Sequence, residues 1–77
     1  MSNEFITLKL IEELNELSTI LLQQHNKPSK DFINEISMEF GDVKYWMGRY
    51  DGTCKLDKKI VQDTYKGKVW KHEKIHM

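Results

Sequence analysis

Four acidic residues form two pairs with the same spacing. Glu13 and Glu16 are three residues apart, and so are Glu39 and Asp42. Side chains three positions apart project from the same side of a helix, so each pair would place two carboxylates together. Like charges at that spacing destabilise a helix by about 0.2–0.5 kcal/mol unless a counter-charge neutralises them. The two pairs together predict a site for a hard divalent cation, and Mg²⁺ is the ion we expect there.

Two helices joined by a short turn are needed to hold these pairs. Apolar residues recur at steps of three and four, the helical period, over residues 3–25 and again over 29–50. The first stripe consists of Ile6, Leu10, Leu14, Leu17 and Leu21, and the second of Phe32, Ile36, Phe40, Val43 and Met47. Pro28 separates the two helices, Ser29 is the predicted N-cap of the second, and Asp51-Gly52 is its predicted end.

A third and weaker helix is predicted over residues 55–72. Leu56 and Ile60 begin an apolar stripe there, and Gly67 interrupts it. No alternating pattern is long enough to predict a strand. The expected fold class is therefore all-α, a helical hairpin plus a third helix in one domain of residues 1–77. We expect this unit to assemble into a four-helix-like bundle by oligomerisation.

One acid of each pair falls within an apolar surface. On a helical wheel of about 100° per residue, Glu13 lies beside the leucine stripe and Glu39 is flanked by aromatic residues. A carboxylate desolvated there without a partner would cost several kcal/mol or take up a proton. A divalent ion shared by the two helices would remove that penalty. The pattern leaves two other interpretations open, a solvated acidic face and ion pairs with Lys44, Arg49 or the C-terminal lysines.

The length of the chain predicts self-association. A chain of 77 residues is one small domain, and a core of that size leaves only a few kcal/mol of net stability. Cys54 is the only cysteine, so no disulfide can add to it, and a cysteine-rich zinc site is excluded. We therefore expect a homodimer or homotetramer.

Charge is unevenly distributed although the formal net charge is zero. Residues 1–42 hold eight acids against three bases, and residues 55–77 hold seven lysines against three acids. The first part suits a cation, and the last part suits an anion or the acidic region of a neighbouring subunit. This balance disfavours nucleic acid as a partner. The short apolar runs predict no membrane span and no signal peptide, so we expect a cytoplasmic protein.

The two acidic elements resemble those of a known enzyme family. Residues 12–16, Glu-Glu-Leu-Asn-Glu, fit the EExxE element of the MazG-like, all-α nucleoside triphosphate pyrophosphohydrolases. Residues 39–42, Glu-Phe-Gly-Asp, fit the ExxD element of that family, and Val43 continues its usual "GDV" run. The resemblance covers about residues 8–50. It implies hydrolysis of an NTP or dNTP to the monophosphate and pyrophosphate, with Mg²⁺ as cofactor.

The resemblance also implies a set of site residues. The metal ligands would be Glu13, Glu16, Glu39 and Asp42, and Glu12 or Glu16 would hold the attacking water or accept its proton. Trp46 is a candidate for stacking on the nucleobase, although packing in the core is its other interpretation. Candidates for phosphate binding are Lys66, Lys68 and Lys71, whose other interpretation is a solvated or inter-subunit basic helix. Glu35 stands where some members of the family place a lysine.

Two other functions remain open at this point. The chain could be a helical interaction module that is not an enzyme and whose acids form surface or inter-subunit ion pairs. It could also be a related phosphoanhydride hydrolase that acts on phosphoribosyl-ATP. Dependence on Mg²⁺ distinguishes the interaction module from both hydrolases, and a panel of substrates distinguishes the hydrolases from each other.

Overall fold

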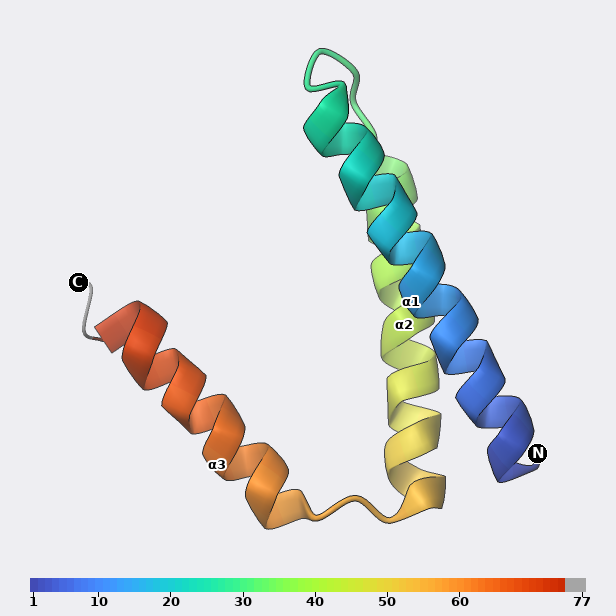
Figure 1. Ribbon diagram of the computed structural model, residues 1–77, viewed down its shortest axis with the longest axis vertical. Helices are drawn as coiled ribbons and strands as arrows, with labels where there is room; N and C mark the ends of the chain where they lie inside the picture. Colours follow the sequence, from blue (N-terminus) through green and yellow to red (C-terminus); the bar gives the residue numbers. More distant parts are fainter. Residues whose placement is uncertain (75–77) are drawn as a thin grey trace.

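The computed structural model describes residues 1–74 and consists of helices. The elements are α1 (Asn3–Asn26), α2 (Ile33–Cys54), α3 (Lys58–Val69) and a final π-helical turn, η1 (Trp70–Lys74). No strand occurs within residues 1–74. The prediction of an all-α fold with three helices is therefore confirmed. Figure 1 shows α1 and α2 as a long hairpin and α3 as a separate arm.

The turn between α1 and α2 is held by one glutamine. Gln24 Nε2 donates to the Lys30 carbonyl oxygen at 2.7 Å, and Gln24 Oε1 accepts from the Phe32 amide at 3.0 Å. Asp31 Oδ1 accepts from the Ile33 amide at 2.9 Å, so α2 begins at Ile33. The predicted start of this helix at Ser29 was therefore wrong. Residues 27–32 are ordered by the Gln24 side chain instead of by a serine cap.

The predicted end of the second helix was also wrong. The helix continues through Asp51 and Gly52 to Cys54, and Lys55 follows in the left-handed conformation with φ of 52°. A glycine inside a helix costs only about 1 kcal/mol relative to alanine, so flanking contacts can keep such a helix intact. Asp51 Oδ1 also accepts from Lys58 Nζ at 3.1 Å, across the link to α3. Gly67 likewise lies within α3 without interrupting it.

The core between α1 and α2 is small. Ile6 and Val43 are the only buried hydrophobic residues within residues 1–74, with exposed fractions of 1% and 6%. Both belong to the predicted stripes, but much of the rest of those stripes faces outward. The most exposed members are Leu14, Leu21, Phe40 and Met47. The hairpin thus packs along a narrow seam and leaves apolar surface uncovered.

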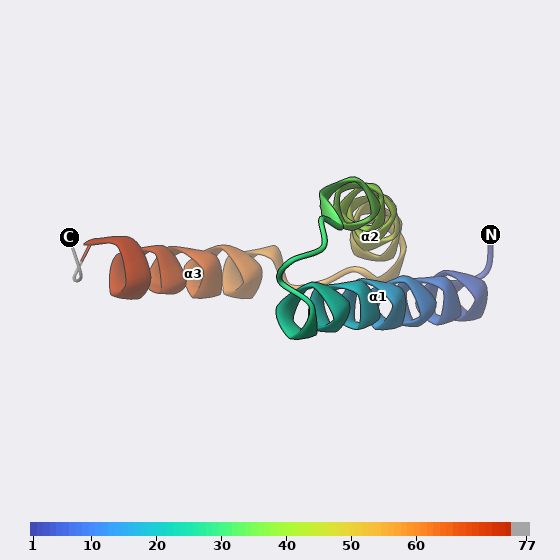
Figure 2. The same cartoon turned by 90° about the horizontal axis from the view of Figure 1, so that it is seen from above.

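The third helix does not pack on the hairpin. Figures 1 and 2 show α3 leaving the end of α2 and pointing away from both other helices. The radius of gyration is 15.4 Å, against about 11.5 Å for a compact chain of this length. None of the helices between residues 1 and 74 combines the length and apolar character that a bilayer crossing requires.

Candidate metal centre

Five carboxylates from both helices gather at the seam of the hairpin. One oxygen each of Glu13, Glu39 and Asp42 lies within 4.8 Å of the others. Glu12, Glu13 and Glu16 form a second such group, and Glu13 belongs to both. The structure thus brings together every acid of the EExxE and ExxD elements. We call these five residues the acidic cluster.

Two members of the cluster carry an oxygen that nothing satisfies. Glu13 Oε2 and Glu39 Oε2 are buried and have no hydrogen-bond partner within residues 1–74. Glu12, Glu16 and Asp42 are exposed. A buried carboxylate oxygen without a donor is unfavourable, because it has lost its water and gained nothing in return. The cluster is therefore a place where a cation would be stabilised.

No basic side chain neutralises these two oxygens in the described part of the chain. Its three ion pairs join Lys9 to Glu12 at 3.4 Å, Lys58 to Asp51 at 3.1 Å and Lys59 to Asp63 at 2.9 Å. Lys44 and Arg49, the expected alternative partners of Glu13 and Glu39, take part in none of these pairs. Within residues 1–74, Glu12 at the exposed edge of the cluster is the one member that forms an ion pair.

The crowding of negative charge changes the titration of the two half-buried acids. Desolvation, followed by the charge of Glu16, raises the pKa of Glu13 to about 7. The same two causes raise the pKa of Glu39 above its usual value. Both pKa values are raised because the carboxylates are partly desolvated and lie close together without a positive charge among them. The cluster can gain that charge as a proton or as a cation.

The donor set favours a hard cation. The two groups that lie close enough to share an ion contain only carboxylates and neither histidine nor cysteine. Mg²⁺ and Ca²⁺ prefer oxygen ligands, whereas zinc sites normally include nitrogen or sulfur. The residues present therefore fit Mg²⁺.

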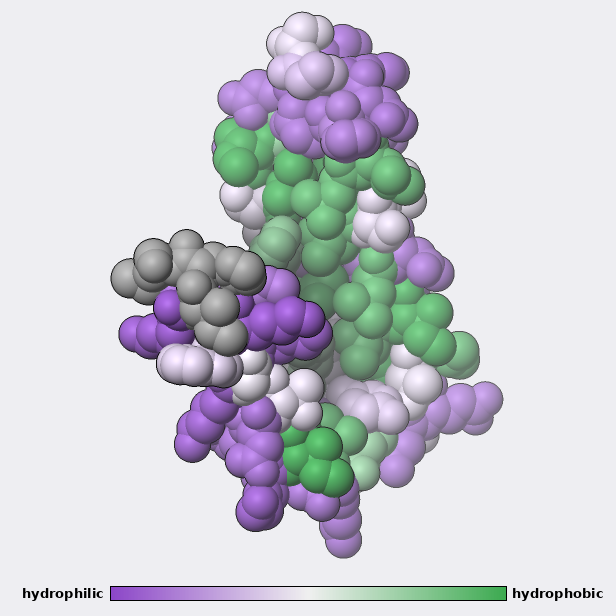
Figure 3. All heavy atoms as spheres, turned by 60° about the vertical axis from the view of Figure 1, so that its left-hand side comes forward, coloured by the Kyte–Doolittle hydropathy of each residue, from purple (hydrophilic) through white to green (hydrophobic). Residues whose placement is uncertain are grey.

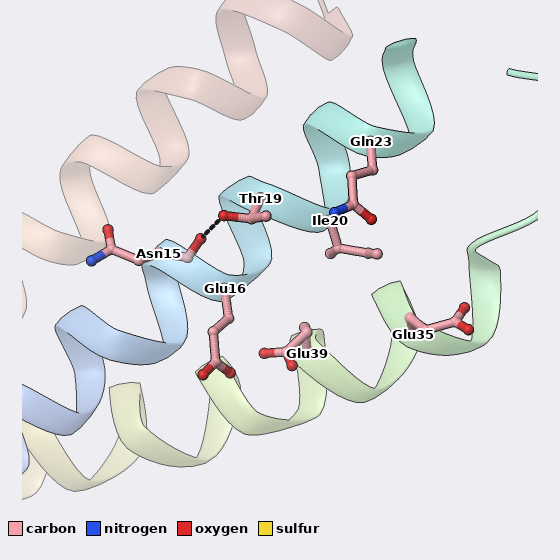
Figure 4. Close-up of a pocket in the computed structure, with 7 residues that line it drawn as sticks. All are labelled: Asn15, Glu16, Thr19, Ile20, Gln23, Glu35 and Glu39. Carbon is pink, nitrogen blue, oxygen red and sulfur yellow. Dashed lines mark hydrogen bonds between the residues drawn. The ribbon is translucent and has the colours of Figure 1, made fainter. Parts of the chain in front are cut away.

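A groove extends from the cluster along the seam. Its volume is about 400 Å³, and it is lined by Asn15, Glu16, Thr19, Ile20, Gln23, Glu35 and Glu39. Figure 4 shows the carboxylates of Glu16 and Glu39 approaching each other from facing helices, with Glu35 nearer the beginning of α2. Thr19 Oγ1 donates to the Asn15 carbonyl oxygen at 2.9 Å. We call this hollow the acidic groove.

The polar residues of the acidic groove were not identified from the sequence. Thr19 and Gln23 follow Glu16 by three and seven residues, a spacing that places all three on one side of α1. That signal was available, but only the position of α2 shows that this side borders a hollow. The volume lies within the range of about 300–1,000 Å³ that is typical of small-molecule sites.

The other predicted site residues lie apart from the cluster or pack elsewhere. Trp46 is half-buried and makes edge-to-face contacts with Phe5 and Tyr45, with ring centroids 5.9 and 5.0 Å apart. These contacts agree with the packing interpretation of Trp46. Lys66 and Lys68 lie on α3, and Lys71 lies on η1. All three lysines are exposed, and their elements do not pack on the hairpin of the same chain.

Comparisons with protein families, curated proteins and solved structures find no match for this chain. The structure itself defines an all-α hairpin with a carboxylate centre at its seam. Such a centre can hold a hard cation next to a groove of small-molecule size. Exposed carboxylates at its edge can also accept a proton from water.

Proposed function

We propose that this protein is a Mg²⁺-dependent nucleoside triphosphate pyrophosphohydrolase. The reaction would convert an NTP or dNTP and water into the monophosphate and pyrophosphate. One observation carries the proposal: the EExxE and ExxD elements meet at one seam, where two buried carboxylate oxygens have no hydrogen-bond partner among residues 1–74. The resemblance of these elements to the MazG-like enzymes supports the choice of reaction.

Each acid of the cluster has a role in this proposal. Glu13, Glu16, Glu39 and Asp42 would hold Mg²⁺, which when bound supplies a positive charge to the triphosphate and polarises its oxygens. Glu12 and Glu16 are exposed, so either could hold the attacking water by accepting its hydrogen bond and then its proton. The acidic groove beside Glu16 and Glu39 would receive the nucleoside. Its amide side chains, Asn15 and Gln23, offer both donors and acceptors.

We include oligomerisation in the proposal. The apolar stripes that the hairpin leaves exposed would be covered when two hairpins form a four-helix-like bundle. Whether the assembly is a dimer or a tetramer is decided by its mass in solution.

Two observations favour a second function, that of an interaction module without enzymatic activity. The exposed apolar surface and the free arm α3 are both typical of a protein that binds another protein. A module of this kind would not need Mg²⁺. Its melting temperature would stay unchanged in millimolar Mg²⁺, whereas a specific site raises it by mass action.

The proposed reaction is tested by measuring pyrophosphate release from the eight common NTPs and dNTPs, with Mg²⁺ and with EDTA. We expect release that requires Mg²⁺ and yields the monophosphate. Glu39→Gln keeps the size of the side chain but removes its charge, so release should fall by at least about 100-fold. Glu4→Gln is the matched control, since Glu4 is exposed and outside the cluster. Normal activity of Glu39→Gln would contradict the assignment of that residue.

A further inference from the structure

The two ends of the acidic groove differ in what they can bind. Glu16 and Glu39 of the acidic cluster lie at one end, where the proposed function requires Mg²⁺ and the phosphates. Gln23, near the end of α1, and Glu35, near the beginning of α2, line the end toward the turn of residues 27–32. Glu16 and Gln23 are seven residues apart, which is about 10 Å along the helix. A ribose and a base together extend over such a distance, so the base would lie between Gln23 and Glu35.

Glu35 has no partner in the described part of the chain. Its side chain is exposed and takes part in none of the side-chain hydrogen bonds or ion pairs within residues 1–74. Glu35 precedes Glu39 by four residues, about one turn of α2. A negative charge so close to the cluster repels a triphosphate. The nucleoside is the uncharged part of the substrate, and it is therefore the part that fits beside Glu35.

The position of Glu35 also has a purely structural explanation. An acid in the first turn of a helix is stabilised by the helix dipole, and Glu35 is the acidic residue in the first turn of α2. That role affects the stability of α2 and treats every nucleotide alike. Recognition of a base would instead make activity depend on the base, so the two roles have separable outcomes.

Ile20 and Thr19 lie between the two ends of the groove. Ile20 is half-buried, and Figure 4 shows it projecting from α1 toward the stretch of α2 between Glu35 and Glu39. Its apolar side chain offers a surface for the face of any base. Thr19 Oγ1 already donates its proton to the Asn15 carbonyl oxygen, so it can only accept a hydrogen bond from a ligand. The choice among bases therefore depends on the end toward the turn.

A second hollow of the hairpin lacks the groups that would recognise a base. It is lined by Leu14, Leu17, Phe40, Gly41, Val43, Lys44 and Met47, of which Lys44 alone has a polar side chain. Figure 3 shows apolar side chains gathered over one face of the hairpin. Bases differ in their hydrogen-bond donors and acceptors, so a hollow of this kind can cover a base but cannot choose among bases.

We propose that Glu35 and Gln23 select guanine nucleotides. An ionised carboxylate accepts hydrogen bonds and donates none. Guanine is the common base whose Watson–Crick edge carries two adjacent donors, N1–H and the N2 amino group, so it can use both oxygens of Glu35. The amide of Gln23 would donate to the neighbouring O6. The substrate class is then GTP or dGTP. That class rests on the proposed hydrolysis, whereas the selection of the base does not.

The other common bases place an acceptor against the carboxylate. Adenine and cytosine present one amino group beside an unprotonated ring nitrogen, and uracil and thymine present one N–H between two carbonyl oxygens. Two facing acceptors leave each other unpaired, which weakens binding. We therefore expect kcat/KM for guanine nucleotides to exceed that for the other bases by at least about 10-fold.

Initial rates of pyrophosphate release from GTP, ITP, ATP, CTP and UTP and their deoxy forms test this selection. Hypoxanthine keeps N1–H and O6 but lacks the N2 amino group, so ITP should fall between GTP and the other nucleotides. Glu35→Gln keeps the size of the side chain and replaces one acceptor by a donor. It should lower kcat/KM for GTP by about 10-fold or more and raise ATP and CTP relative to GTP. Glu4→Gln, exposed and outside the groove, should leave the ranking of bases unchanged.

A second variant and a check on folding accompany this experiment. Gln23→Ala removes the donor to O6 and should slow GTP and ITP by a similar factor. Circular dichroism of each variant shows whether its helical content is that of the original chain. Equal kcat/KM for all bases in the original chain would overturn the selection. So would a Glu35→Gln variant that slows every nucleotide by the same factor, which is the result that a role in the helix dipole alone would give. A preference for NTPs over dNTPs without a preference for guanine would also overturn it.

A binding measurement that needs no turnover keeps the two proposals distinguishable. Calorimetric titrations with GMP, AMP, CMP and UMP, in Mg²⁺, should show GMP bound at least about 10-fold more tightly than the others. Glu35→Gln should remove that difference. Selective binding of GMP by a protein that hydrolyses no nucleotide would support the selection and contradict the proposed function. Hydrolysis of triphosphates without any preference for guanine would support the proposed function and contradict the selection. A protein that neither binds GMP nor hydrolyses any nucleotide would contradict both.

Discussion

Glu13 and Glu39 lie where burial and neighbouring carboxylates make their ionised forms unfavourable. Each has one buried oxygen that accepts no hydrogen bond from residues 1–74, and each lies close to other carboxylates of the cluster. The spacing of the acids and the apolar surroundings of these two residues follow from the sequence. The absence of any basic partner for them within residues 1–74 depends on where α2 lies against α1.

The raised pKa of Glu13 leads to a prediction about stability and pH. Because the folded state holds the proton more tightly than the unfolded state, this group favours folding most below its usual pKa of 4.5. Its contribution is lost as the pH rises toward the folded-state pKa of about 7. In EDTA, the free energy of unfolding from urea titrations should therefore fall between pH 5 and pH 8. Glu13→Gln should reduce this fall.

Mg²⁺ should reverse that trend, because a cation and a proton compete for the same carboxylates. Millimolar Mg²⁺ is expected to stabilise the protein more at pH 8 than at pH 6. An equal effect at both pH values would show that the ion binds away from Glu13 and Glu39.

At the scale of elements, the turn of residues 27–32 fixes how α1 and α2 align. Gln24 makes two hydrogen bonds across this turn, to Lys30 and to Phe32. The alignment in turn decides which residues of α2 face Glu13 and Glu16. The turn therefore affects the geometry of the site although none of its residues belongs to the acidic cluster.

The variant Gln24→Ala should destabilise the hairpin. Loss of two hydrogen bonds is expected to cost about 1–3 kcal/mol of unfolding free energy. Gln23→Ala is the matched control, because the side chain of Gln23 forms no hydrogen bond within residues 1–74 and its loss should cost less than about 0.5 kcal/mol. Urea titrations of both variants measure the difference. Equal stabilities would show that the turn is held by its backbone alone.

The chain as a whole has more surface than a compact protein of its mass. Only two hydrophobic side chains are buried within residues 1–74, and α3 stands free of the hairpin. A single chain with so small a core is expected to be marginally stable. Its stability must then depend on concentration, because association adds the missing burial.

Dilution should therefore lower both the mass and the helical content. We expect sedimentation to show an assembly at high concentration and circular dichroism to lose helical signal as the protein is diluted. The loss should correspond mainly to α3, which does not pack on the hairpin and is joined to it within residues 1–74 by the Lys58–Asp51 ion pair. A helical signal that stays constant during dissociation to monomers would contradict this dependence.

The sequence by itself determined the helices and the faces of their acids. Helical spacing is a property of neighbouring residues, so the apolar stripes and the two acidic pairs could be assigned without tertiary contacts. The boundaries of α2 could not. Its start depends on the side chain of Gln24 in α1. At its other end the helix continues through Asp51-Gly52 to Cys54, although this pair of residues favours a turn.

Tertiary structure alone decided where these faces lie relative to one another. The packing of α1 on α2 places five carboxylates at one seam and forms the acidic groove. It also leaves two of the carboxylate oxygens without a partner among the residues that the structure describes. The direction of α3 keeps Lys66, Lys68 and Lys71 away from that groove in the same chain. Both results depend on contacts or gaps between residues far apart in the sequence, which the helical period of one segment does not encode.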